Sequence, residues 1–332
     1  MPCLCRALFC VQLLIIFIKT KRLEPVFKYI REFYQKEFNP YYFSLILLLL
    51  GSIIYLNYWH FLERRYVAGG KTRLSNFIGY YLLYFVPFAV AFILQLFFYK
   101  DCTYYRNYWF WVVLLLAPAF FSFRVNFNFH EGVVSKIWSG DALKFWLHCT
   151  GWIVRVFVLL IPVFIIWLIK DKNNQPFYGT AALDNVRPYL LMLFFMLPIA
   201  VITGTQSDFL DMYPMAKYIN PLDISYKSWR YIIYEFCYGF DFISIEFFFR
   251  GFLILALLKI CGTHCIIPVA CFYCTIHFGK PMGEAISSFW GGLLLGIISY
   301  NTGSIWGGLI VHLGIAWLME TVSWLGLLVK VR

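Results

Sequence analysis

The sequence predicts an all-α, polytopic membrane protein with about eight or nine transmembrane helices. Of the 332 residues, 61% are hydrophobic, 22% are aromatic and only 14% are charged, whereas soluble domains use roughly 45–50% apolar residues. The mean hydropathy is +0.71. Long apolar segments also recur along the chain. We therefore expect an integral, multi-pass membrane protein that has membrane lipids as its immediate partners.

The apolar segments give the number of expected helices. A helix needs about 17 to 25 mainly apolar residues to cross a hydrocarbon core about 30 Å thick. One candidate segment, which ends at His277, is short, and the last one is long, so the count stays at eight or nine. The candidates are residues 41–59, 76–99, 108–123, 146–169, 189–204, 232–258, 264–277, 285–300 and 305–329.

The net charge of +11 does not indicate a nucleic-acid partner, and we expect none. Lys and Arg lie between the apolar segments, where they meet anionic lipid headgroups. Six of them lie between residues 19 and 36, before the first clear span, and four lie between residues 64 and 73, after it. Because basic residues flank this span on both sides, the positive-inside rule leaves the orientation open.

The ten cysteines show no pairing pattern, and most lie in apolar segments, where a thiol acts as a small hydrophobe. Residues 7–18 form a short apolar run like the core of a signal peptide, but they lack a small-residue cleavage site. A targeting signal, an interfacial anchor and an upstream-extended start all fit this run.

Changes in polarity divide the chain into four parts. Residues 1–40 are a basic and apolar N-terminal segment, and residues 41–204 are a transmembrane scaffold with aromatic residues at its membrane boundaries. Residues 205–229, which contain three Asp and two Pro residues, form a polar connection. Residues 230–329 are a second transmembrane region, which carries the candidate site.

The most informative polar residues of this last region are Glu246 and Arg250, which stand four residues apart in an apolar run. A charged side chain at bilayer depth costs at least about 2.5–3.5 kcal/mol, so an intramembrane pair indicates a functional site. On a helix the two side chains share a face and can form an ion pair. Asp241 lies on nearly the same side about one turn earlier. A buried ion pair that only fixes helix packing is the alternative.

Two histidines extend this polar set. His277 ends an apolar run and precedes Phe278-Gly279-Lys280-Pro281, a sequence that ends a helix, so we expect it near a membrane face or a cavity mouth. A capped helix end is the simpler interpretation of His277. His312 has only apolar neighbours, and a buried imidazole needs hydrogen-bond partners. Together with Glu246, the two histidines predict a shared polar site.

Common protease signatures are absent from the sequence. The zinc motif His-Glu-x-x-His fails because His130-Glu131 is followed by Val134 where the second His would stand. The Gly-x-Ser-x-Gly elbow of serine hydrolases does not occur either.

Three short motifs instead resemble those of the CAAX-protease and bacteriocin-processing (CPBP, or Abi) family. They are Glu246-x-x-x-Arg250-Gly251, the aromatic-x-x-x-His of residues 273–277, and Gly303-Ser304-Ile305-Trp306 leading to His312. A glycine-rich helix at residues 291–296 lies between the second and third motifs, where small residues allow close helix packing. The resemblance covers about residues 230–329.

The resemblance implies an intramembrane endopeptidase that acts on a membrane-borne or prenylated peptide. It implies that Glu246 is the general base, with His277 as its partner, and that His312 donates to the oxyanion. Arg250 would hold the glutamate helix in register. No cofactor is expected, although one Glu and two His (Glu246, His277 and His312) also form the ligand set of several catalytic zinc sites, so a zinc-dependent membrane protease is one alternative.

Two positions depart from the family pattern. Ile245 stands where the family has the first, catalytic Glu of an adjacent pair, and Ala316 stands where it has an oxyanion-holding Asn. Either Glu246 acts as the base, with Asp241 as a second carboxylate, or the chain is a non-catalytic CPBP-fold protein with an immunity or scaffold role. A small-molecule transporter ranks third, since no inverted repeat is evident.

Overall fold

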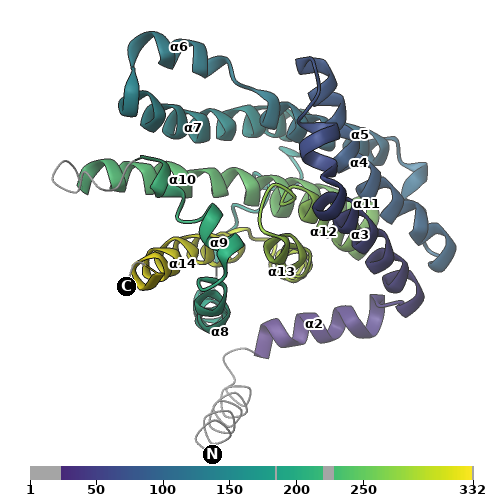
Figure 1. The fold of residues 1–332 in the computed structure, drawn as a ribbon. Coiled ribbons are helices and arrows are strands. Elements are labelled where there is room, and N and C mark those ends of the chain that lie inside the picture. Colours follow the sequence, from purple (N-terminus) through teal and green to yellow (C-terminus); the bar gives the residue numbers. More distant parts are fainter. Residues whose placement is uncertain (1–23, 184, 220–227, 331–332) are drawn as a thin grey trace, which may run out of the picture.

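The computed structural model describes residues 24–183, 185–219 and 228–330, which form a bundle of helices (Figure 1). This part of the chain has no β-strand, and one isolated bridge joins Thr180 and Ser304. The all-α prediction is therefore confirmed. The run at residues 7–18, for which a signal or an anchor was considered, lies outside the described residues.

Most elements follow one another after a few residues, but a longer connection, residues 172–186, separates η3 from α8. In chain order they are α2 (Glu24–Glu37), α3 (Pro40–His60), η1 (Leu62–Val67), α4 (Arg73–Phe98), η2 (Tyr104–Arg106), α5 (Tyr108–Asn126), α6 (Phe129–Ile137), α7 (Gly140–Ile166), η3 (Trp167–Asp171), α8 (Arg187–Thr203), α9 (Ser207–Met212), η4 (Met215–Ile219), α10 (Ser228–Glu246), η6 (Phe247–Ala256), α11 (Leu257–Cys261), η7 (Gly262–Cys265), α12 (Ile266–Thr275), α13 (Met282–Thr302) and α14 (Trp306–Lys330).

Seven helical runs in the described residues are long and apolar enough to cross a membrane, by length and composition. They support an integral, multi-pass membrane protein, close to the eight or nine helices that the sequence predicts. The difference has two sources. Helix α8 has only 17 residues, and the predicted spans 232–258 and 264–277 form one helical run, Trp229–Thr275, which is interrupted at Gly262 by a positive φ of 54°.

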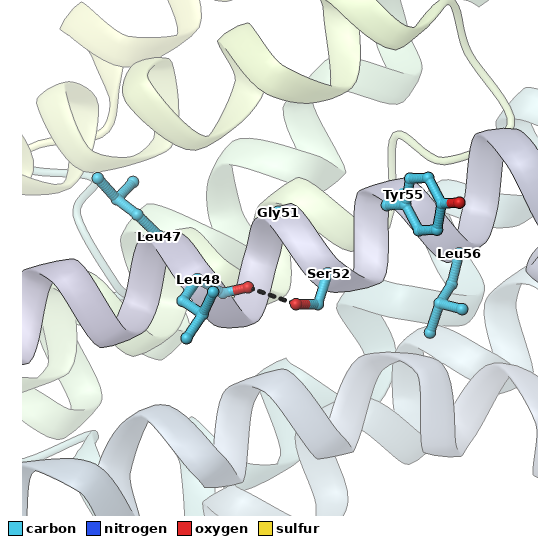
Figure 2. A pocket seen from close by; sticks show the side chains of 6 residues that line it. All are labelled: Leu47, Leu48, Gly51, Ser52, Tyr55 and Leu56. Atoms are coloured by element: carbon cyan, nitrogen blue, oxygen red, sulfur yellow. Dashed lines mark hydrogen bonds between the residues drawn. The ribbon is translucent and has the colours of Figure 1, made fainter.

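The outer face of the bundle carries many large apolar side chains, as lipid contact requires. A shallow hollow on α3 is an example (Figure 2). It is lined by Leu47, Leu48, Gly51, Ser52, Tyr55 and Leu56. The Ser52 hydroxyl in this lining donates to the Leu48 carbonyl at 2.8 Å, so the helix itself satisfies it. This hollow contains none of the predicted site residues.

The interior of the bundle is built around α12 and the continuous run of α10 and η6. In Figure 1, α10 runs alongside α7. Helix α12 packs against α4, α13 and η6, and all ten of its residues are buried. Helix α14 packs against both α8 and α10. This arrangement brings η6, α12 and α14 together.

Candidate active site

Glu246 is the last residue of α10 and is fully buried. Its Oε1 lies 2.8 Å from His312 Nδ1 and 3.3 Å from Arg250 Nη1. Because an ionised carboxylate only accepts hydrogen bonds, His312 Nδ1 is the donor here. The side chains of Glu246, Arg250 and His312, on α10, η6 and α14, are therefore in contact. The predicted Glu246–Arg250 ion pair is observed.

The second oxygen of this carboxylate, Oε2, has no hydrogen-bond partner in the described part of the chain. It faces Gly308 on α14, and a Cβ added to Gly308 would lie only 2.5 Å from Oε2. Glycine is therefore the residue that lets α14 approach Glu246 so closely. The carboxylate is oriented through Oε1 and keeps the lone pairs of Oε2 unused.

Arg250 lies in η6, a π-helical stretch that begins directly after Glu246. Such stretches are rare and are found frequently at functional sites. The guanidinium is almost fully buried and lies 4.1 Å from the centroid of the Tyr273 ring, so the ring face stabilises its charge. Its Nη1 is paired with Glu246 by charge, but neither Nη1 nor Nη2 makes a hydrogen bond to the described residues. Two strong donors therefore remain unused beside the carboxylate.

Tyr273 connects the two histidines and was not singled out as a site residue by the sequence analysis. Its hydroxyl lies 3.2 Å from His312 Nε2, and its carbonyl accepts a hydrogen bond from His277 Nδ1 at 2.9 Å. Its ring also packs against the His277 ring, with centroids 4.7 Å apart. The sequence feature that could have identified Tyr273 is its hydroxyl group, on an aromatic residue four positions before His277.

His277 follows the end of α12 at Thr275, as the sequence predicts. A carbonyl can only accept, so Nδ1 carries the proton and Nε2 of the neutral ring has a free lone pair. Burial lowers the pKa of His277 to about 3, so the ring is neutral near pH 7 and is a weak base. Among the described residues, the hydrogen-bond partner of Glu246 is therefore His312 and not His277.

Asp241 lies away from this cluster, in a separate ion pair. Both of its carboxylate oxygens lie 2.6 Å from Nη2 of Arg124 on α5, and the Ser244 hydroxyl also contacts it. The side chains of Asp241 and Arg124 are mostly buried. The pair joins α10 to α5 and leaves Asp241 with a partner of its own.

The two positions that depart from the family pattern are filled by apolar packing. Ile245 is buried in the main core. Ala316 is buried in a second cluster together with Trp152, Tyr234 and Tyr238.

Glu246, His277 and His312 do not fit a zinc site. Within the described residues, one set of three ligand atoms lies within 4.8 Å of one another, at Asp101, Cys102 and His264. Glu246, His277 and His312 do not form such a set. We therefore derive no step through a metal at Glu246.

The region that holds these residues has a recognisable sequence. Residues 228–318 match the family model described as type II CAAX prenyl endopeptidase Rce1-like. The predicted resemblance to the CPBP family is confirmed. The match includes Glu246, Arg250, His277 and His312, and at the level of the family it supports a membrane protease. No curated protein and no solved structure matches the chain.

Proposed function

We propose that the protein is an intramembrane endopeptidase that hydrolyses a peptide bond of a membrane-associated or lipid-modified peptide. One observation carries this proposal: Glu246 is fully buried, is oriented by His312 and keeps Oε2 without a hydrogen-bond partner in the described chain. A buried carboxylate with a free oxygen is suited to take a proton from water.

In the proposed reaction, a water molecule binds at Oε2 and gives a proton to Glu246 as its oxygen forms a bond to the scissile carbonyl carbon. The tetrahedral intermediate then breaks the C–N bond, and the leaving amine takes the proton from Glu246. His312 holds the carboxylate through Nδ1, and the Tyr273 hydroxyl fixes the opposite edge of that ring. Both contacts keep the base in one orientation during the transfer.

The negative charge of the intermediate needs donors, and Ala316 offers none. Arg250 is the best candidate because its Nη1 and Nη2 have no hydrogen bonds in the described chain and lie beside the carboxylate. A preorganised donor of this kind contributes about 2.7–4 kcal/mol to transition-state stabilisation. His277, whose Nε2 is an acceptor, would orient the water. These roles differ from those that the family resemblance implies for Arg250 and His312.

The substrate class follows from the surroundings of the site. Glu246 lies within a helical run that is long and apolar enough to span the membrane, so a substrate must reach it from the bilayer or its interface. The family match to CAAX prenyl endopeptidases favours a peptide that carries a prenyl group.

The test compares Glu246→Gln with wild-type protein in liposomes that contain a prenylated peptide or its unmodified form. Glu246→Gln removes the base and is expected to lower kcat/KM at least about a hundredfold while the protein stays folded. His277→Ala is expected to lower kcat as well. Glu320→Gln is the matched control, because Glu320 is an equally buried carboxylate on α14 that contacts the Met215 amide. Full activity of purified Glu246→Gln would refute the mechanism.

A non-catalytic scaffold is the second candidate, and the apolar packing of Ile245 and Ala316 favours it. In that case wild-type protein cleaves no peptide, and Glu246→Gln mainly lowers the melting temperature without changing the cellular function. Measuring cleavage and thermal stability on the same samples separates the two candidates.

A further inference from the structure

A second group of chemically active side chains lies outside the site around Glu246. Asp101 and Cys102 belong to the connection between α4 and α5, and His264 belongs to η7, the turn before α12. His264 Nε2 lies 3.4 Å from Asp101 Oδ2, and the ligand atoms of all three residues lie within 4.8 Å of one another. Figure 1 shows α4, α5 and α11 on the same side of the bundle.

We propose that Asp101, Cys102 and His264 form a zinc-binding site that joins the α4–α5 connection to the turn between α11 and α12. One thiolate, one imidazole nitrogen and one carboxylate oxygen are the donors that Zn²⁺ accepts, at bond lengths of about 2.0–2.3 Å. In a tetrahedral site such bonds separate neighbouring ligand atoms by about 3–4 Å. The observed separations need only small side-chain adjustments. Mg²⁺ and Ca²⁺ prefer oxygen ligands and fit this set poorly.

Buried hydrogen bonds hold the two segments in place without a metal. The Gln95 side chain, which is almost fully buried, donates to the His264 carbonyl at 2.8 Å and accepts from the Tyr104 hydroxyl at 3.0 Å. The His264 ring packs against Tyr99, with centroids 4.9 Å apart. Such support around the ligands orients them and strengthens metal binding.

An ion can reach the site from outside the bundle. Asp101 has a side chain that is 77% exposed. A hollow lined by residues 96–100, Cys102 and Tyr105 reaches the buried thiol. The fourth zinc ligand can be water. Binding releases the thiol proton of Cys102 to water.

The position of the site gives it a structural role. Helix α12 begins at Ile266, two residues after His264, and its other end leads to Tyr273 and His277. A zinc ion at His264 fixes the start of α12 and so limits movement of the helix that carries these two residues. The inference is independent of the proposed protease activity.

The test measures metal binding by the purified full chain in detergent, after removal of any polyhistidine tag. Zinc content is measured after dialysis against Zn²⁺, and Co²⁺ is used as a spectroscopic probe. We expect about one zinc per chain, a thiolate-to-cobalt absorption band and a melting temperature that rises with Zn²⁺ concentration. Asp101→Asn, at an exposed position, is expected to weaken zinc binding at least about tenfold.

Matched variants show where the metal binds. Cys102→Ala is expected to remove the thiolate band, whereas Cys149→Ala, at another buried free cysteine, keeps it. His264→Gln is expected to lower zinc content, whereas His60→Gln does not. Absence of the thiolate band in wild-type protein would overturn the proposal, and so would an equal band in Cys102→Ala. If Asp101 and His264 form only a surface ion pair, Zn²⁺ leaves the melting temperature unchanged.

Discussion

Two carboxylate–guanidinium pairs lie on the same helical run, and they are built differently. In the Asp241–Arg124 pair, both carboxylate oxygens contact one guanidinium nitrogen at 2.6 Å, and the two partners come from different helices. In the Glu246–Arg250 pair, the shortest separation is 3.3 Å, and Oε2, Nη1 and Nη2 make no hydrogen bond to the described residues. The first pair joins two helices. The second leaves polar atoms for a substrate and water.

The largest expected effect is a loss of stability when the Asp241–Arg124 pair is broken. Asp241→Asn leaves Arg124 buried without its counter-charge, so we expect a loss of about 3 kcal/mol in the free energy of unfolding. Activity per folded molecule is expected to stay near the wild-type value. Denaturant unfolding in detergent measures the loss of stability, and a cleavage assay on the same samples measures the activity per folded molecule. If Asp241→Asn keeps its stability but loses cleavage, Asp241 acts in the site as a second carboxylate.

The close approach of α14 to Glu246 gives the next effect. Gly308→Ala places a methyl carbon only 2.5 Å from Oε2, so the carboxylate must turn or the helices must separate. We expect kcat to fall about 10- to 100-fold, since small displacements of a catalytic group have effects of this size. Gly291→Ala, at a glycine with open space around its Cβ position, is the control. Equal activity of both variants would show that Oε2 is not used.

A smaller effect is expected from the hydroxyl that holds His312. Tyr273→Phe keeps the ring against Arg250 and removes only the contact to Nε2. We expect kcat to fall a few-fold to about tenfold, with KM and the melting temperature nearly unchanged, because one hydrogen bond contributes about 1 kcal/mol. A KM effect alone would indicate that Tyr273 contacts the substrate.

The smallest effect concerns pH. The pKa of His277 is lowered to about 3 in the folded protein, whereas an unfolded histidine titrates near 6.5. The unfolded state therefore binds more protons as the pH falls below about 6.5, and this site alone should lower the stability by less than about 1 kcal/mol from pH 7 to pH 6. Unfolding of wild type and His277→Gln at both pH values measures the difference. An equal pH dependence would show that His277 is accessible to protons in the fold.

Some contacts of the site could be predicted from the sequence, and others could not. The Glu246–Arg250 pair joins residues four apart on one helix, so helical geometry alone predicts it. The contact between His312 and Glu246 spans 66 residues, and that between Arg124 and Asp241 spans 117. The sequence placed His277 next to Glu246 because both belong to one family pattern, but a motif does not state which ring nitrogen faces which oxygen.

The sequence by itself determined the membrane class, the helical architecture and the end of α12 before His277. Hydropathy and helix ends depend on residues that are close together in the sequence, so the sequence alone predicts them. Only the tertiary structure decided which polar atoms are satisfied and which stay free at Glu246, and which side chains meet at Asp101, Cys102 and His264. These outcomes depend on how helices pack side by side, and packing joins residues that are distant in the sequence.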